Sequence, residues 1–319
     1  MPDPVVVIPV YNHPATIGAM VAAVRGHGLR CILVDDGSEA GCAAVLDALA
    51  AQHGQPVTLL RLASNQGKGG AMLAGLREAR RQGFEHALQI DADGQHDPAD
   101  IPRFVALSRR HPDAVICGCP VYDDSVPRGR LYARYLTHVW VWINTLSLAI
   151  RDSMCGFRIY PLASTVALID EVAIGRRMDF DSEVLVRLHW RGVAVVNLPT
   201  RVHYPQDGVS HFRAWRDNLL ISRMHATLFA GMLLRAPAAP AAGRAMTTRA
   251  APHWARIGES SFVFGMWLLY GVHRTLGRLP FRLCLYPVVA WYWATRPLAR
   301  RSSLEYLRRL QAAHGGVCS

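Results

Sequence analysis

The first 120 residues alternate between strand-like and helix-like segments, and this alternation limits the possible folds more than any other feature of the sequence. Short β-branched runs predict strands, and the segments between them have the apolar spacing of helices. The predicted strands are residues 5–10, 30–35, 57–62, 86–91 and 114–118, and the predicted helices are residues 15–25, 42–52, 70–81 and 101–110. Strands joined by helical crossovers form a mostly parallel sheet with helices on both faces. We therefore expect an α/β fold.

The second half of the chain has a looser pattern. It predicts helices over residues 128–150, 180–191 and 218–234 and a strand over residues 193–198. Residues 235–252 are rich in Ala, Pro and Arg, which is typical of a linker. We therefore expect a domain over residues 1–234, a linker over 235–252 and a helical tail over 253–319.

The net charge of +11 is concentrated in the tail. Residues 1–234 contain 23 Lys and Arg against 22 Asp and Glu, whereas residues 235–319 contain 12 against 2. The tail also contains two aromatic-rich apolar runs, residues 260–270 and 283–294, each too short to span a bilayer. This mixture favours an anionic membrane surface over nucleic acid as the partner and predicts a hairpin in the membrane interface. A hairpin packed in a protein core is the alternative.

Polar side chains follow four of the predicted strands at the point where each strand ends: Tyr11 and Asn12, Asp35 and Asp36, the run Ser64 to Lys68, and Asp91 and Asp93. Ligands of parallel sheets bind beyond the carboxyl ends of the strands. Two carboxylates two residues apart suit Mg²⁺ or Mn²⁺, although a solvated turn would have the same pattern. Lys68 is the only lysine among 35 basic residues, and between glycines it is placed either to meet a diphosphate or to lie exposed in a loop.

Four motifs occur in order at consecutive strand ends: Val7-Ile8-Pro9-Val10-Tyr11-Asn12, Val34-Asp35-Asp36-Gly37-Ser38, Asn65-Gln66-Gly67-Lys68-Gly69-Gly70-Ala71 and Asp91-Ala92-Asp93-Gly94-Gln95-His96-Asp97-Pro98. Together they resemble the family-2 glycosyltransferases of the GT-A fold, in the branch of dolichyl-phosphate mannose and glucose synthases, over about residues 4–230. The resemblance implies a GT-A sheet and a nucleotide-sugar donor. The sugar and the nucleotide stay open.

The resemblance also implies roles for individual residues. A divalent cation, Mg²⁺ or Mn²⁺, would be held by Asp91, Asp93 and Gln95. The nucleotide sugar would be bound by Pro9, Tyr11, Asn12, Asp35, Asp36, Gly67, Lys68, Asp91, Ala92, Asp93 and Arg158, the last in the segment on the donor-sugar side.

The acceptor decides which catalytic residues are needed. A hydroxyl acceptor requires a general base, for which Asp181 is the first candidate and Glu183 the second, unless both are charges that stabilise a helix N-terminus. A phosphate acceptor requires cations instead, for which Arg130, Arg134 and Arg213 are the candidates. The sequence Gly118-Cys119-Pro120 departs from the Gly-Ser-Arg common in polyprenyl-phosphate transferases, so both acceptors stay open.

The tail resembles the opening segment of lipid A type acyltransferases from His253 to Leu310, but it lacks that family's catalytic histidine followed by an acid. We therefore expect an acyltransferase partner or fusion. The resemblances together predict an inverting glycosyltransferase that moves a sugar from a nucleotide diphosphate to a lipid-linked acceptor in envelope glycolipid synthesis. Seven cysteines without regular spacing favour a reducing compartment, and hence a peripheral protein on the cytoplasmic face of the inner membrane. A catalytically idle, membrane-tethered module that binds nucleotide sugars is the alternative.

Overall fold

The computed structural model describes residues 3–52, 57–121, 128–202 and 214–235, together with residues 274 and 286 as isolated positions. The chain divides into two compact units, Met1–Met232 and Leu233–Ser319. The predicted linker and tail lie outside the described residues apart from Arg235 and the two isolated positions, so the predicted domain limits stay predictions. No helix among the described residues is long and apolar enough to cross a membrane.

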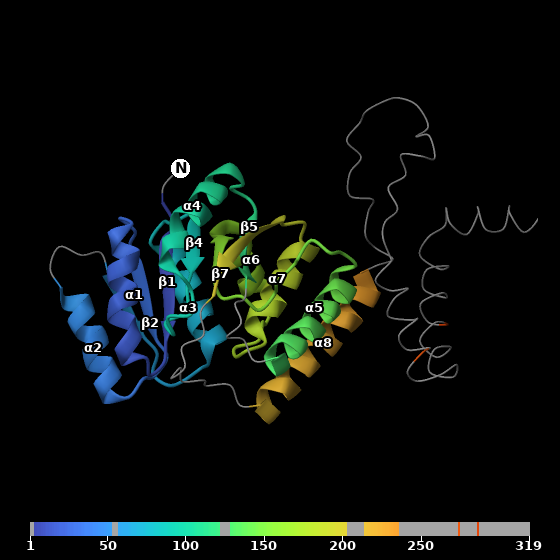
Figure 1. The fold of residues 1–319 in the computed structure, drawn as a ribbon, viewed down its shortest axis with the longest axis horizontal. Helices are drawn as coiled ribbons and strands as arrows, with labels where there is room; N and C mark the ends of the chain where they lie inside the picture. Colours follow the sequence, from blue (N-terminus) through green and yellow to red (C-terminus); the bar gives the residue numbers. More distant parts are fainter. Residues whose placement is uncertain are drawn as a thin grey trace, which may run out of the picture. The chain divides into compact units, whose positions relative to one another are not determined.

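Strands and helices alternate through the first unit, as the sequence predicts (Figure 1). The strands are β1 (Val5–Val10), β2 (Cys31–Asp35), β3 (Val57–Arg61), β4 (His86–Gln89), β5 (Val115–Val121), β6 (Arg158–Pro161) and β7 (Val195–Arg201). The helices are α1 (Pro14–Gly26), α2 (Ala40–Ala51), α3 (Lys68–Arg81), the 3-10 turn η1 (Pro98–Asp100), α4 (Ile101–Arg110), α5 (Arg128–Thr145), α6 (Leu162–Glu171), α7 (Phe180–Trp190) and α8 (Ala214–Arg235).

All the described strands belong to one sheet, in the order β3-β2-β1-β4-β6-β5-β7. Strand β6 runs antiparallel to both of its neighbours, β4 and β5, and the other pairs are parallel. The predicted mostly parallel α/β sheet is therefore confirmed. Because β6 is reversed, its first residue, Arg158, pairs with the last residue of β4, Gln89. The start of β6 thus lies at the edge where the parallel strands end.

Two apolar layers cover the sheet. Alternate residues of β1 point to opposite faces, so Val5 and Val7 pack with α3, α6 and α7, whereas Val6 and Ile8 pack with α1, α2 and α4. Helices α5 and α8 lie side by side and extend the first of these layers (Figure 1). This burial on both faces is typical of a sheet built from crossover units.

The structure differs from the predicted elements in three places. The helix predicted over residues 128–150 ends at Thr145, because Leu146 takes a left-handed φ of 50° that a helix cannot continue. Strand β6 and helix α6 were not predicted at all. Strand β6 has only four residues, which is too short to show a period, and its first residue is a buried arginine.

Candidate active site

The loops that follow β1 and β2 are tied to each other. The main-chain N–H of Asn12 donates to Ser38 Oγ at 3.2 Å, and the N–H of Glu39 donates to Asn12 Oδ1 at 2.8 Å. Asn12 takes a positive φ of 56°, which asparagine tolerates better than most residues. Pro9 lies inside β1, opposite Val34, and Tyr11 follows the strand. The predicted nucleotide-binding residues of β1 therefore share one edge with β2.

Asp35 and Asp36 hold the neighbouring loops in place. Asp35 accepts from Ser38 N at 2.9 Å and from Arg61 Nε at 2.8 Å. Burial alone would raise the pKa of Asp35, but these donors outweigh it and lower the pKa. Asp36 accepts from Gln66 N at 2.7 Å and from Gly67 N at 2.8 Å, yet burial still raises its pKa. Both carboxylates thus shape the site, and their predicted contact with the nucleotide stays a prediction.

The glycine-rich loop packs tightly against the segment that precedes α7. Gly67 has a positive φ of 86°, and a Cβ there would lie 2.6 Å from the carbonyl oxygen of Arg176. The N–H of Gly70 donates to the same oxygen at 2.8 Å. Because only glycine fits at Gly67, the loop delivers Lys68 to the first position of α3 at a fixed place.

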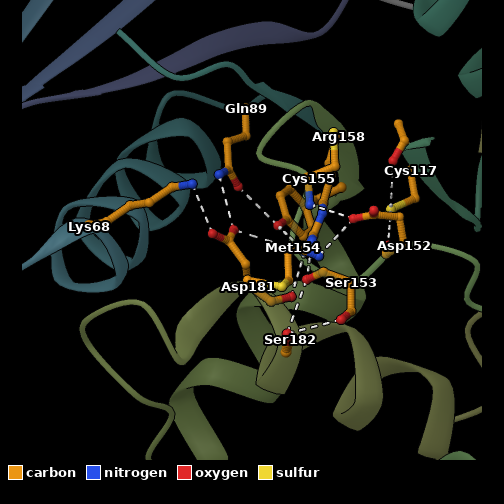
Figure 2. Close-up of polar contacts among 12 residues, drawn as sticks. Lys68, Gln89, Cys117, Asp152, Ser153, Met154, Cys155, Arg158, Asp181 and Ser182 are labelled. Atoms are coloured by element: carbon orange, nitrogen blue, oxygen red, sulfur yellow. Dashed lines mark hydrogen bonds and ion pairs between the residues drawn. The ribbon is translucent and has the colours of Figure 1, made fainter. Parts of the chain in front are cut away.

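The ammonium group of Lys68 bridges two carboxylates. Its Nζ lies 2.8 Å from Asp91 Oδ2 and 2.8 Å from Asp181 Oδ2. Figure 2 shows the side chain reaching from α3 toward Asp181. Burial alone would lower the pKa of Lys68, but the charges of Asp181 and Asp91 raise it well above its ordinary value, so the group stays protonated. The structure therefore places Lys68 inside the site and not exposed in a loop.

Asp91 and Asp93 offer the oxygen ligands that a hard divalent cation prefers. Asp91 Oδ1 is buried and has no hydrogen-bond partner among the described residues. Asp93 accepts from Gln95 N at 3.0 Å, and burial together with the negative charge of Asp91 raises the pKa of Asp93. A cation would satisfy the unpaired oxygen and relieve this repulsion, so the donor set fits the expected metal.

The ligand set stays a prediction. The described residues contain no cluster of three or more His, Cys, Asp or Glu side chains suited to a metal. The predicted third ligand, Gln95, would add an uncharged oxygen. Ala92 between the two aspartates is buried, and its carbonyl accepts from Thr16. This contact fixes the turn that carries both carboxylates.

The structure buries Arg158, and its predicted contact with the donor stays a prediction. Its side chain is fully buried, and its guanidinium donates to the carbonyl oxygens of Asp181 and Ser153, each at 2.6 Å (Figure 2). Arg158 positions Asp181, because it holds the main chain at the start of α7.

A hydrogen-bond chain extends this support. Tyr160 donates to Gln89 Oε1 at 3.0 Å, and Gln89 donates to Asp181 Oδ1 at 3.2 Å. Neither Gln89 nor Tyr160 was predicted as a site residue, because a buried polar residue within a strand has no distinctive spacing. Asp181 is therefore held by Lys68 on one oxygen and by Gln89 on the other.

The second base candidate, Glu183, is occupied on both oxygens. Oε2 accepts from the N–H of Gly175 at 2.8 Å, and Oε1 accepts from Arg187 Nε at 2.8 Å. Both acidic residues lie in the first turn of α7, where the helix dipole favours negative charge. The alternative of a helix-stabilising charge therefore fits Glu183 best.

Arg134 forms an ion pair with the buried carboxylate of Asp152. Its Nε and one terminal nitrogen each lie 2.7 Å from an oxygen of Asp152. His138 Nε2 lies 3.3 Å from the same carboxylate. Burial would raise the pKa of Asp152, but these two partners lower it. The predicted acceptor contact of Arg134 stays a prediction. The side chain of Arg130 and all of Arg213 lie outside the described residues.

Two arginines next to the glycine-rich loop were missed. Arg176 donates to Gln66 Oε1 at 3.4 Å. The positive charge of Arg177 offsets part of the rise that burial causes in the pKa of Asp36. Two consecutive arginines, four and five residues before Asp181, are the signal that could have found them. They add positive charge beside the place where the resemblance puts a diphosphate.

Comparison with known proteins agrees with this geometry. The family described as Glycosyl transferase family 2 matches residues 5–173. The chain is 29% identical over 208 residues to an undecaprenyl-phosphate mannosyltransferase of Micrococcus luteus, covering 60% of this chain and 80% of that protein. It is 29% identical over 224 residues to a polyprenol monophosphomannose synthase of Mycolicibacterium smegmatis, which covers 64% of this chain and 79% of that protein.

A solved structure shares the fold. Glucosyl-3-phosphoglycerate synthase from Mycobacterium tuberculosis in complex with phosphoglyceric acid has a TM-score of 0.52 and 17% identity, covering 73% of this chain and 80% of that one. The same enzyme in complex with Mn²⁺ and UDP-glucose has a TM-score of 0.50 and 18% identity, covering 73% of this chain and 79% of that one. The predicted GT-A-like fold and the predicted family are therefore confirmed: this chain belongs to the family-2 glycosyltransferases.

Proposed function

We propose that this glycosyltransferase moves a sugar from a nucleotide diphosphate to a polyprenyl phosphate, with inversion at the anomeric carbon and with a divalent cation at Asp91 and Asp93. The observation that carries the proposal is the pair of carboxylates beyond β4, one of which has a buried oxygen without a partner among the described residues. The relatives named above are an undecaprenyl-phosphate mannosyltransferase and a polyprenol monophosphomannose synthase, which supports the class of acceptor.

Each part of the site has a defined task in this reaction. Asp91, Asp93 and the Gln95 amide hold the cation, which when bound stabilises the negative charge that develops on the leaving diphosphate. Lys68 and the neighbouring Arg177 add positive charge near the diphosphate. The loops after β1 and β2 surround the nucleotide. Arg158 and Gln89 keep Asp181 in place beside the reacting groups.

The occupied oxygens of Asp181 favour a phosphate acceptor over a hydroxyl. A phosphate oxygen is already anionic, so it attacks the anomeric carbon without losing a proton. A hydroxyl needs a base with a free oxygen. Asp181 accepts from Gln89 and Lys68, and Glu183 accepts from Gly175 and Arg187, so neither is free in this conformation. The hydroxylated lipid acceptor is therefore the second candidate.

An exposed apolar surface supports the proposed location. One side of α8 exposes Trp215, Leu219, Phe229 and Leu233, and the exposed Trp140 of α5 packs edge-on against Phe229. We call the α8 residues of this set the α8 apolar stripe. An exposed stripe of this kind, followed in the sequence by a basic tail, suits peripheral binding to an anionic membrane. We propose that the stripe and the tail hold the enzyme at the cytoplasmic face of the inner membrane, where it serves envelope glycolipid synthesis alone or with an acyltransferase.

The test is transfer by the purified full chain. We expect a labelled sugar from a panel of UDP- and GDP-sugars to appear on undecaprenyl phosphate in the presence of Mn²⁺ or Mg²⁺, as measured by mass spectrometry of the lipid. Undecaprenol, which has the same chain without the phosphate, is the matched control acceptor. Transfer to undecaprenol alone would establish the hydroxyl acceptor. Donor binding without any transfer or hydrolysis, unchanged in Asp93→Ala, would establish the idle binding module.

A further inference from the structure

We infer that Lys68 is an internal counter-cation, which joins Asp91 to Asp181 in the metal-free protein and releases Asp91 when a divalent cation binds. The inference rests on the proposed function, because it concerns the same metal site. It adds a prediction that the proposed function does not make: part of the cooperativity between the cation and the nucleotide diphosphate depends on the side chain of Lys68.

The geometry places one ammonium between one metal ligand and one positioned acid. Nζ lies 2.8 Å from an oxygen of each carboxylate, and the Lys68 side chain is 18% exposed. The pair of contacts links α3, the turn after β4 and α7, which lie far apart in the sequence. An ammonium at this distance neutralises the same carboxylate that a divalent cation would need.

The carboxylate of Asp91 has no room to turn away from the ammonium. A Cβ at Gly156 would lie 2.1 Å from Asp91 Oδ2 and 2.7 Å from Oδ1, so the carboxylate lies flat against the main chain. The lysine is the part that is able to move, because its side chain is long and flexible. The main chain at its base is fixed by the packing of Gly67 and by the hydrogen bond from Gly70 to Arg176. A divalent cation on the unpaired Oδ1 of Asp91 would therefore repel the ammonium on Oδ2, and the ammonium is the group that moves away.

A displaced ammonium needs a new anionic partner. Asp181 remains on one side, and a diphosphate bound at the cation supplies another. A bound nucleotide diphosphate thus gives the Lys68 ammonium a new anionic partner in place of Asp91. A metal ion without nucleotide provides no such partner. Binding of the cation and binding of the nucleotide then strengthen each other, and by linkage the coupling is the same in both directions.

The first experiment measures Mn²⁺ binding to the full-length protein by calorimetry, without nucleotide and then with saturating UDP or GDP. We expect Lys68→Met to bind Mn²⁺ about 10-fold more tightly than wild type without nucleotide, because the competing charge is gone. We also expect the tightening caused by the nucleotide to be smaller in this variant. Arg77→Met is the matched control, because Arg77 is a cation of the same helix that pairs with Asp170 on the surface. It should behave like wild type.

The outcomes separate this inference from the proposed function. If wild type binds Mn²⁺ and Lys68→Met binds it equally or more weakly, the inference is overturned and the metal site stands. If neither protein binds Mn²⁺ with or without nucleotide, the inference and the metal dependence both fail.

A second pair of variants covers the case in which Lys68→Met does not fold, because it leaves two buried carboxylates without their cation. The double variant Lys68→Met/Asp181→Asn removes one charge of each sign and is compared with Asp181→Asn alone. In Asp181→Asn the lysine has only Asp91 left, so Mn²⁺ should bind more weakly than in wild type. The double variant should then bind it about 10-fold more tightly than the single one. Equal affinities of these two variants would overturn the inference.

Discussion

Gly156 lets the main chain pass directly against the Asp91 carboxylate. A Cβ at this position would lie 2.1 Å from Oδ2, closer than any side-chain carbon approaches an oxygen without displacing it. The residue precedes the buried Phe157 and Arg158, so the main chain has little freedom to retreat. A single methyl group here would therefore move the carboxylate that the proposed cation needs.

We predict that Gly156→Ala lowers the rate of sugar transfer by about 100-fold, since displacements near 1 Å have effects of that order. Mn²⁺ affinity should fall with it, whereas the far-UV circular dichroism stays that of wild type. Gly18→Ala is the control, because no heavy atom lies within 4 Å of the added Cβ. Full activity of Gly156→Ala would show that Asp91 does not have to keep its position.

Glu183→Gln should separate a structural from a catalytic role. Its contacts with Gly175 and Arg187 predict a loss of about 2 kcal/mol in the free energy of unfolding, because a buried charged pair is broken. Activity per folded molecule should change by less than about 3-fold, which is too little for the loss of a general base. Urea unfolding and initial rates are the measurements. Glu171→Gln, which breaks the exposed pair with Arg191, should leave both unchanged.

At the level of residues, the sequence predicts which side chains gather at the candidate site, but it does not predict which of them contact one another. The carboxylates and the glycine-rich loop are adjacent to strand ends, so the parallel pattern predicts that Asp36, Lys68 and Asp91 gather at one edge. That Lys68 also meets Asp181 depends on how α7 packs, and no local spacing reports it. The burial of Arg158 was not predictable either, because arginine side chains are mostly exposed and this one is fully buried.

Helices α5 and α8 are joined through a buried histidine. Asn144 Nδ2 lies 3.3 Å from His225 Nδ1, and an amide NH₂ can only donate, so this ring nitrogen accepts and the ring is neutral. His225 Nε2 is buried without a hydrogen-bond partner among the described residues. Burial lowers the pKa of His225 from its ordinary 6.5 to about 4. The contact between the two helices therefore depends on pH.

The sign of this dependence follows from proton linkage. Between pH 6.5 and 4 the unfolded chain binds a proton at His225 that the folded chain does not, so stability falls as the pH falls through this window. At pH 4.5 this histidine should remove about 2 kcal/mol relative to pH 7. In urea unfolding, His225→Gln should not show this part of the fall in the free energy of unfolding. His27→Gln, which changes an exposed histidine, should still show it. Equal losses in wild type and His225→Gln would contradict the buried neutral ring.

At the level of elements, the periodic segments were predictable and the reversed strand was not. Helix α4 has the predicted bounds, and β1 does too, because a long apolar period or a β-branched run determines each of them. Strand β6 pairs with β4 and β5 through only four residues, and its place depends on partners far away in the sequence. The GT-A resemblance gave the fold class, but the residues alone did not give the reversed strand.

For the molecule as a whole, the α8 apolar stripe predicts association with membranes. Trp215 is 90% exposed and Leu219 is 66% exposed, so neither is needed for the core. We predict that Trp215→Glu/Leu219→Glu lowers the partition of the full chain into phosphatidylcholine and phosphatidylglycerol vesicles by at least about 10-fold. The change removes apolar area that the bilayer would bury and adds repulsion between the new carboxylates and the anionic lipid. Sedimentation with the vesicles measures this.

The control adds the same two charges elsewhere. Ala51→Glu/Gln52→Glu changes two exposed positions at the end of α2 and should leave the partition close to that of wild type. The thermal midpoint of all three proteins should agree. If the α8 variant binds vesicles as well as the α2 variant does, the stripe is not the membrane contact and the basic tail alone accounts for binding.

The position of β6 between β4 and β5 has a consequence for how the protein is made. Strands β3, β2, β1 and β4 are complete once residue 89 has left the ribosome, but β4 gains its second neighbour only when residues 158–161 emerge. For that whole interval the nascent sheet has a bare edge, and bare edges pair readily with other chains. Chaperone capture or a translational pause should therefore matter most while α4, β5 and α5 are being synthesised.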